Sequence, residues 1–369
     1  MHVGAARKEV MLSGSTGNPT TGDNARWDDA IARLNGDLLQ SWYWGKFKQR
    51  HGWHVERLHV EQSSGEAMAQ LLFRRRGPFS LGYLPRGPLI SGNDMIAARL
   101  LGAIDEACAR HRAIALVVEP DRPLPPGWLQ KGIGFVNGPE SFQTSRTVKV
   151  PLASDEELLA RMRKDTRYNV LYARRQGIEV EFAPAEPAAF ATFYRLLQET
   201  SRRNAFGIHE RVYYEDFLRL FGDQAVLLFS RSDGVPTSAL IAARTGDECR
   251  SMYAGSSIAH RVRGDAALLH FEAMRWARDH GCARFDLGGI ASGTVSPGQR
   301  GNDGDGDRRG ASLEGVHQFK VGFGGEIIAY PPTVERRYRP GLAWLVRRVN
   351  ARFRPVAQGS QSSRTNELD

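Results

Sequence analysis

Two glycine-rich segments in the last third of the chain, residues 281–290 and 315–325, are the best candidates for chemistry. The first predicts a helix stop followed by a short apolar strand that ends in two glycines. The second places Phe319 and Lys320 directly before a stretch in which three of four residues are glycine. Glycine lets a bulky polar ligand approach the backbone, and a lysine beside such a surface can hold negative charge. A strand pair joined by glycine turns explains the same spacing, so both interpretations stay open.

Residues 261–266, Arg-Val-Arg-Gly-Asp-Ala, form a second candidate site directly before a predicted helix. They have the Arg-x-x-Gly-x-Ala form with which GNAT-type acetyltransferases hold the pyrophosphate of coenzyme A, and a helix N-terminus suits a phosphate. Asp265 places a negative charge at that anion site. The motif therefore favours a GNAT-like unit more than it favours coenzyme A.

A basic helix is predicted after residue 153. Ser154 and Glu157 have the spacing of a capping box, and the following turns are rich in basic residues up to Gly177. The candidate phosphate-binding residues are Arg163, Lys164, Arg167, Arg174 and Arg175. A solvated helix face and a phosphate-contacting surface both account for this pattern.

The composition is that of a globular protein with a basic surface. With 369 residues, of which 41% are hydrophobic and 25% charged, the chain is long enough for two domains. Its formal net charge of +9 favours polyanionic partners such as nucleic acid, phosphorylated substrates or an anionic membrane face. Three widely spaced cysteines indicate a reducing compartment, and nothing near Met1 has the form of a secretory signal. We therefore expect a cytoplasmic protein with no metal site.

Three segments lack the periodicity of helices and strands. We expect a disordered leader over residues 1–30, a mobile loop over 291–312 and a disordered end from residue 358. Residues 336–354 mix aromatic and basic side chains. This mixture fits a helix that lies on an anionic membrane surface, or a terminal helix packed on the core.

The rest of the chain contains an internal repeat. Strand-like residues at 68–73 and 83–84, a helix around 95–110 and a strand at 114–118 recur when 169 is added to their numbers. The second copy comprises residues 237–242, 252–253, 265–279 and 283–287. Unless short apolar runs agree by chance, this predicts a duplicated α/β unit.

From about residue 38 to residue 340 the chain resembles the Fem-type peptidoglycan-bridge aminoacyltransferases. The resemblance rests on short motifs that follow one another in the family's order. They lie at residues 38–48, 83–88, 119–121, 166–169, 174–177, 206–209, 213–214, 252–257, 285–290 and 319–325. The resemblance implies an α/β (α+β) fold of two tandem GNAT-like acyltransferase domains. The family's coiled-coil arm is expected to be absent, because no charged heptad run interrupts the second domain.

The resemblance also implies a reaction, in which an amino acid passes from aminoacyl-tRNA to an amine on the stem peptide of a peptidoglycan precursor. Phe319 and Lys320 match the pair at the acyl-transfer centre, and Lys320 is expected to stabilise an oxyanion or to grip the terminal phosphate of the tRNA. The residues expected near the precursor are Lys48, Glu119, His209, Arg211, Tyr213 and Tyr253. His209 stands where the family often has arginine, so Arg211 is a candidate to replace that arginine.

We expect the first GNAT-like domain to cover residues 31–152, with 329–345 packing back on it, and the second to cover 153–328. Residues 341–369 would form a basic amphipathic tail and a disordered end. The expected function is transfer of glycine, alanine or serine in bridge formation, by a monomer that uses aminoacyl-tRNA as co-substrate and no cofactor. The acceptor would be a lipid-linked or UDP-linked muropeptide at an anionic membrane face. The alternatives are an acyl-coenzyme A-dependent N-acyltransferase and a non-catalytic basic protein that binds nucleic acid or membrane.

Overall fold

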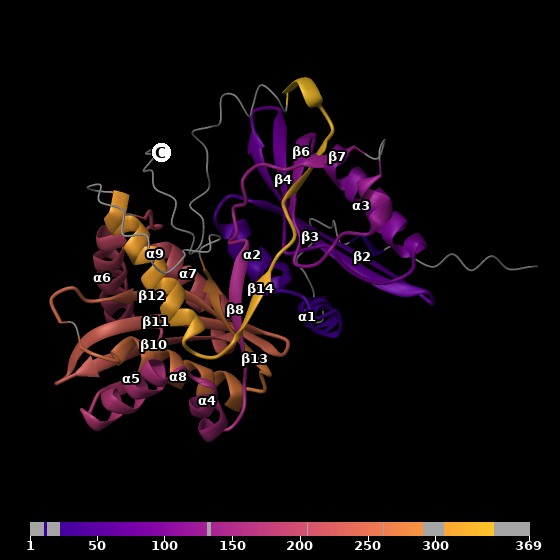
Figure 1. Ribbon diagram of the computed structural model, residues 1–369. Helices are drawn as coiled ribbons and strands as arrows, with labels where there is room; N and C mark the ends of the chain where they lie inside the picture. The colour runs from indigo at the N-terminus through magenta and orange to yellow at the C-terminus, as the bar shows by residue number, and fades with distance from the viewer. Residues whose placement is uncertain are drawn as a thin grey trace, which may run out of the picture. The chain divides into compact units, whose positions relative to one another are not determined.

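The computed structural model describes residues 11–12, 23–130, 134–204, 206–260, 262–290 and 306–342. The chain divides into two compact units, each built around its own sheet (Figure 1). Among the described residues, the first unit comprises those up to Ser141 and those from Pro331 onward, and the second comprises those from Phe142 to Tyr330. No described helix has the length and hydropathy that a membrane span needs.

The first unit is a mixed sheet in the order β1-β2-β3-β4-β6-β15-β7, with β5 paired to β3. Its strands are β1 (Met11–Leu12), β2 (His54–Gln62), β3 (Gly65–Arg76), β4 (Phe79–Pro85), β5 (Leu89–Gly92), β6 (Ala113–Glu119), β7 (Phe135–Asn137) and β15 (Val334–Arg337). Its helices are α1 (Asp23–Arg33), η1 (Leu38–Gln40), α2 (Trp42–Arg50), α3 (Asp94–Arg110) and η2 (Pro126–Leu129). Helix α3 begins after Asn93, whose side chain caps it. It buries Ile96, Leu100 and Ile104, which are spaced one helical turn apart, in the core.

The second unit is a mixed sheet in the order β14-β8-β13-β12-β11-β10-β9. Its strands are β8 (Arg146–Pro151), β9 (Glu179–Ala183), β10 (Ala225–Ser232), β11 (Val235–Thr245), β12 (Glu248–Ser256), β13 (Arg284–Gly289) and β14 (Glu326–Ala329). Its helices are α4 (Asp155–Arg161), α5 (Lys164–Arg175), α6 (Pro187–Asn204), α7 (Arg211–Phe221), η3 (Gly222–Gln224), α8 (Asp265–Asp279) and α9 (Gly306–Val321). Figure 1 shows α4, α5 and α8 on one face of this sheet and α6 and α7 on the other.

The internal repeat is present in the structure at the predicted offset. Adding 169 to the bounds of β3, β4, α3 and β6 gives residues 234–245, 248–254, 263–279 and 282–288, which overlap β11, β12, α8 and β13. In both units a helix joins two neighbouring parallel strands, β4 to β6 and β12 to β13. The two units are therefore built on the same strand–helix–strand crossover.

Four sequence-based expectations need correction. The division between the units lies at residue 141, not at 152, because β8 pairs with β13 and β14 in the second sheet. Residues 23–30 of the expected leader belong to α1 (Asp23–Arg33), which buries Trp27 and Ile31. Residues 306–312 of the expected loop belong to α9. The basic stretch after residue 153 is two helices, α4 and α5, because Met162 is extended between them.

The other expectations about segments fall partly outside the described residues. These are the leader before residue 23 apart from β1, the loop from 291 to 305, Arg261 of the Arg-x-x-Gly-x-Ala motif, and the tail from 343 to 369. Strand β15 pairs with β6 and β7, which joins the chain after residue 331 to the first sheet. Cys108, Cys249 and Cys282 are free and buried.

Candidate active site

The parallel strand pair of the second unit opens after three residues. Strands β12 and β13 pair only over residues 248–250 and 284–286. Beyond this ladder β13 turns to β8, where Gly289 pairs with Thr147. The equivalent pair of the first unit, β4 and β6, stays paired as far as Pro85. Within the described residues, the parallel strands diverge in the second unit and stay paired in the first. The backbone groups at the point where β12 and β13 diverge can hydrogen-bond to an extended substrate.

Lys320 lies at this opening, in the last turn of α9. Its Nζ donates a hydrogen bond of 2.8 Å to the carbonyl oxygen of Gly289. A Cβ built on the neighbouring Gly288 would lie 3.4 Å from that Nζ and 3.5 Å from the carbonyl oxygen of Ser251 on β12. The ammonium group and the edge of β12 therefore meet over Gly288, a buried residue without a side chain.

The glycines after Lys320 have a different role from the one expected. A Cβ on Gly322 would lie 2.1 Å from Oγ1 of Thr166, and one on Gly324 would lie 2.2 Å from the carbonyl oxygen of Arg161. These glycines let the end of α9 pack directly against the start of α5 and the end of α4. The glycines from 322 onward therefore fix the position of Lys320 and do not leave bare backbone for a ligand.

The environment of Lys320 lowers its proton affinity. Burial lowers the pKa of Lys320 to about 8, an effect that the nearby Asp286 opposes and Arg250 reinforces. At pH 7 the side chain is still mostly protonated. Such a cation in a partly desolvated position interacts strongly with negative charge that develops beside it.

Phe319, the predicted partner of Lys320, is packed rather than presented to the opening. Its ring meets those of His270 and Phe323 edge-on, with centroids 5.2 Å apart in both cases. Burial lowers the pKa of His270 to about 4, so this imidazole is neutral at physiological pH. The ring hydrogen-bonds through Nδ1 to the carbonyl oxygen of Ala266 at 2.8 Å. Since a carbonyl only accepts, Nδ1 carries the proton. This contact fixes the wall on which Phe319 rests.

A cluster of aromatic side chains contains three of the expected precursor-binding residues. The rings of His209 and Tyr213 stack with centroids 3.8 Å apart, and Tyr253 lies edge-on to Tyr213 at 6.4 Å. Burial raises the pKa of Tyr253 well above its usual value, so its hydroxyl stays protonated. Arg211 stands apart, at the start of α7, with its guanidinium 2.9 Å from Glu215.

In the first unit, Lys48 and Glu119 belong to one cluster of aromatic and polar side chains. The hydroxyl of Tyr83 donates a hydrogen bond of 2.6 Å to Glu119, and the Tyr83 ring lies 6.4 Å from that of Trp53. The ammonium of Lys48 lies 5.7 Å from the same Trp53 ring. Burial lowers the pKa of Lys48 to about 8, and the nearby Arg74 contributes to this. Trp53 and Tyr83 thus lie between Lys48 and Glu119, the two residues of this unit that the resemblance predicts near the precursor.

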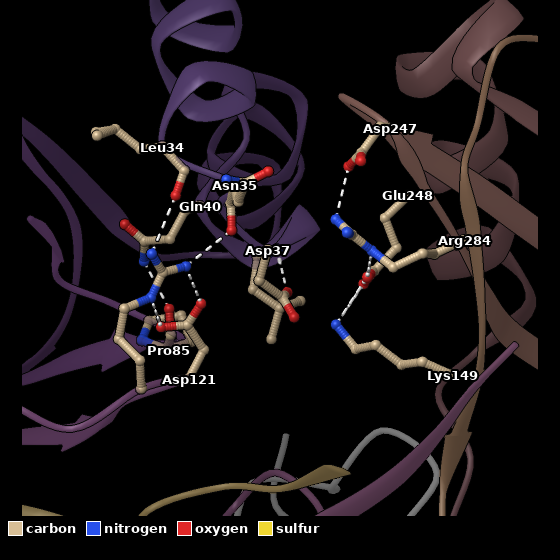
Figure 2. A network of polar contacts seen from close by, with 12 residues as sticks. Leu34, Asn35, Asp37, Gln40, Pro85, Asp121, Lys149, Asp247, Glu248 and Arg284 are labelled. Carbon is tan, nitrogen blue, oxygen red and sulfur yellow. Dashed lines mark hydrogen bonds and ion pairs between the residues drawn. The ribbon is translucent and has the colours of Figure 1, made fainter. Parts of the chain in front are cut away.

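Two networks of polar contacts hold these regions (Figure 2). In the first unit, the guanidinium of Arg122 donates hydrogen bonds to the carboxylate of Asp121 and to the carbonyl oxygens of Leu34 and Asn35. These contacts anchor the segment after Glu119. In the second unit, Glu248 accepts hydrogen bonds from Lys149 on β8 and lies 3.5 Å from Nε of Arg284 on β13. This second network closes the end of the β12–β13 ladder opposite to the opening.

The chain is similar to a family model, to named proteins and to solved structures. Residues 160–299 match the model of the acetyltransferase (GNAT) domain family. The lipid II:glycine glycyltransferase of Staphylococcus epidermidis is 22% identical over 334 residues, which cover 69% of this chain and 80% of that protein. The protein of the same name from Staphylococcus saprophyticus is 28% identical over 216 residues, 53% of this chain and 52% of that one. The crystal structure of FemX has a TM-score of 0.74 at 20% identity and covers 88% of this chain and 98% of FemX. The resemblance to the Fem-type family is confirmed.

The Fem-type fold accounts for the architecture of the chain. Two GNAT-like units stand in tandem, as the resemblance implied, and the GNAT match falls on the unit that carries the opened strand pair and Lys320. The described residues include no coiled-coil arm.

The basic residues expected to contact phosphate do not all remain available on the surface of this GNAT-like unit. Arg163 precedes α5 and donates a hydrogen bond of 2.7 Å to the side chain of Gln318 on α9. Arg174 is paired with Glu272 at 2.8 Å and lies over the ring of Phe271. Arg167 is half-buried, whereas Lys164 and Arg175 are exposed.

The structure also shows what occupies the anion site before α8. One carboxylate oxygen of Asp265 accepts a hydrogen bond of 2.6 Å from the N–H of Ala266, and the other accepts one of 2.6 Å from the hydroxyl of Ser238. Gly264, with φ +86°, packs its backbone against Asn169 of α5. The side chain of Asp265 therefore sits where a phosphate at this helix N-terminus would bind.

Three residues of this site were not predicted from the sequence. Asp286 and Arg250 form a buried ion pair of 3.6 Å, and His270 supports Phe319. Asp286 could have been predicted from the sequence, because it lies in the motif that contains Gly288 and Gly289. Arg250 and His270 sit in a strand and a helix without any local signal, and they become recognisable only through their tertiary contacts.

Proposed function

We propose that this protein is an aminoacyltransferase that moves an amino acid from aminoacyl-tRNA to the side-chain amine of a peptidoglycan-precursor stem peptide. The observation that carries the proposal is the ammonium group of Lys320 at the opened strand pair of a GNAT-type unit. The similarity to proteins named lipid II:glycine glycyltransferase supports it and makes glycine the first amino acid to test, before alanine and serine.

In the proposed reaction the amine nitrogen attacks the carbonyl carbon of the aminoacyl ester. The C–N bond forms, the ester C–O bond breaks, the amine loses a proton and the departing ribose oxygen gains one. Because the ester is already activated, the main contribution of the protein is alignment of two substrates, which can supply about 7–11 kcal/mol. Lys320 stabilises the oxyanion of the tetrahedral intermediate, a role whose loss costs roughly 2.7–4 kcal/mol in other acyl-transfer enzymes. We propose no resident cofactor for this step.

Two separate sets of residues are proposed to contact the precursor, Lys48 and Glu119 in the first unit and Tyr213 and Tyr253 in the second. Lys48 is a cation at neutral pH and suits a phosphate of a lipid-linked or UDP-linked muropeptide. Burial raises the pKa of Tyr253 and keeps its hydroxyl protonated, so this hydroxyl can donate a hydrogen bond to a peptide carbonyl. His209 is proposed to act by holding Tyr213 in place through their stack, whereas Arg211 takes the charge of the family arginine.

An acyl-coenzyme A donor is less compatible with the structure. Its pyrophosphate would have to displace the carboxylate of Asp265 from the N-terminus of α8, where that carboxylate already accepts the available hydrogen bond. Two negative charges at one helix end repel each other. This observation favours aminoacyl-tRNA over coenzyme A as the donor.

A transfer assay tests the proposal. The purified protein is mixed with tRNA charged with labelled glycine, alanine or serine and with a lipid-linked or UDP-linked muropeptide, and the product is analysed by mass spectrometry. We expect the muropeptide to gain one amino-acid residue on its side-chain amine. Transfer from acetyl-coenzyme A without transfer from tRNA would replace the proposal by the acyl-coenzyme A reaction. Absence of any transfer, with muropeptide or RNA still bound, would leave the non-catalytic binding protein.

A further inference from the structure

Helix α5 carries two stacked tyrosines on the surface of the second unit. The rings of Tyr168 and Tyr172 have centroids 5.8 Å apart and planes inclined by 22°. The guanidinium carbon of Arg263 lies 4.8 Å from the Tyr168 ring and 5.6 Å from the Tyr172 ring. Tyr168 is 42% exposed, and Leu171, an apolar neighbour on the helix, is 39% exposed. Large apolar side chains exposed together on one helix indicate a binding surface.

The arrangement of these groups is rigid. Nε of Arg263 donates a hydrogen bond of 3.0 Å to the side chain of Asn169 on α5. The next residue, Gly264, lies so close to α5 that a Cβ there would be 2.2 Å from the carbonyl oxygen of Asn169. Opposite the tyrosines, Val170 and Ala173 anchor the helix in the core. The platform of Tyr168, Tyr172 and Arg263 is therefore formed before any ligand arrives, which reduces the entropic cost of binding.

The charges around the platform suit a polyanion. Lys164 and Arg175 are exposed near the two ends of α5, and within the described residues neither forms an ion pair. Arg174, by contrast, is neutralised by Glu272. Asp165 is the acidic residue of the helix. Cations on either side of exposed aromatic rings are the pattern of surfaces that bind single-stranded nucleic acid, where bases stack and phosphates are neutralised.

The platform leads to the candidate active site. The backbone N–H of Arg163 donates a hydrogen bond of 2.9 Å to the carbonyl oxygen of Gly322, two residues after Lys320. Thr166, in the first turn of α5, touches the same glycine. From Thr166 to Tyr172 the helix axis extends ~9 Å. A single strand of nucleic acid lying along α5 would thus end beside the last turn of α9.

We propose that Tyr168, Tyr172 and Arg263 form a stacking platform for unpaired bases near the 3′ end of an RNA whose terminus reaches Lys320. The inference rests on the proposed function and adds a recognition surface to it. Lys164 and Arg175 contact the phosphates on either side. The bases are recognised by stacking and not by their edges, so the platform tolerates different base sequences.

RNA binding by the full-length protein tests this platform. The probes are an uncharged tRNA, a single-stranded oligonucleotide with the sequence of its 3′ end, and the same sequence as a duplex. We expect Tyr168→Ala to weaken binding of the tRNA and the single strand about 10-fold and to leave weak duplex binding unchanged. Tyr168→Trp should retain tight binding. Arg175→Gln should reduce the slope of log Kd against log salt by about 1. Phe182→Ala, at a 50% exposed aromatic residue on β9, and Arg202→Ala, at an exposed arginine on α6, are the matched controls.

Two results with the variants would overturn the platform. One is unchanged RNA affinity in both Tyr168→Ala and Arg263→Ala, and the other is an equal loss in the Phe182→Ala control. If the wild-type protein nevertheless transfers an amino acid from tRNA, the proposed function stands and only the platform fails. If the platform variants lose RNA binding while no protein transfers an amino acid, the surface stands and the proposed reaction fails. A wild-type protein that binds none of the probes assigns the surface to another kind of partner and refutes the inference.

Discussion

The carboxylate of Asp286 accepts a hydrogen bond of 2.7 Å from the backbone N–H of Gly288. The same oxygen accepts a hydrogen bond from the hydroxyl of Thr147 on β8, and Oδ2 lies 3.6 Å from Nε of Arg250 on β12. A fully buried carboxylate therefore connects three strands at the point where β12 and β13 diverge. Because the residue after Gly288 carries the carbonyl that binds Lys320, Asp286 also sets the position of the ammonium group.

Two replacements of Asp286 test separately its role in positioning Lys320 and its role as the counter-charge of Arg250. Asp286→Asn retains the size of the side chain but directs an N–H group toward other donors, so we expect the rate of transfer to fall at least about 10-fold while KM for both substrates changes little. Asp286→Ala leaves Arg250 without its buried counter-charge and should lower the free energy of unfolding by about 3 kcal/mol. Urea unfolding and steady-state kinetics measure the two effects. Asp279→Asn, at an exposed carboxylate, is the control, and wild-type rates in both Asp286 variants would contradict the role.

Lys320 should be needed for turnover and not for folding. Lys320→Ala removes the cation at the opened strand pair, and we expect kcat to fall by a factor on the order of 10²–10³. Thermal stability should stay the same or rise, because removal of a partly desolvated charge relieves a burial cost. Lys320→Arg should retain part of the activity, since the charge remains but its planar head cannot occupy the same position. Full activity of Lys320→Ala in the transfer assay would contradict the proposed centre.

The lowered pKa of Lys320 predicts a pH dependence of a defined sign. With a pKa of about 8, Lys320 is protonated below that pH and loses its charge as the pH rises above it. Stabilisation of the oxyanion is therefore present at pH 7 and lost toward pH 9. The acceptor amine becomes more nucleophilic over the same range, so the informative quantity is the ratio of wild-type rate to that of Lys320→Arg, which stays charged. We expect this ratio to fall about 10-fold per pH unit above pH 8, and a constant ratio would contradict the assignment.

The duplicated architecture could be predicted because burial repeats even where residues do not. Buried Ile104 of α3 corresponds to buried Ala273 of α8 at the offset of 169. The position stays apolar and buried in both helices although the two side chains differ greatly in volume. The position of Lys320 before a glycine-rich turn was likewise visible in the chain. In both cases the signal is local, since helices and turns are specified within a few residues.

The parts that could not be predicted depend on tertiary contacts. Helix α9 begins in a glycine- and aspartate-rich segment with poor helix propensity, and at its other end Phe319 packs against His270 and Phe323. The pair of Arg250 and Asp286 joins two strands that neighbour each other only in the folded sheet. No pattern of spacing along the chain reports such contacts.

Two glycines allow the packing of the second unit to be tested against a matched control. A Cβ on Gly255 of β12 would lie 2.6 Å from the backbone nitrogen of Leu197 on α6, so this glycine lets the helix backbone contact the strand. Gly255→Ala should therefore lower the free energy of unfolding by about 1–3 kcal/mol, because neither backbone can move aside cheaply. Gly102, within α3 of the first unit, has open space at the same position. Gly102→Ala should raise the free energy of unfolding by about 0.5–1 kcal/mol through the lower flexibility of the unfolded chain. Urea unfolding of both variants measures these changes, and shifts of the same sign would show that the contact between α6 and β12 is looser than the structure describes.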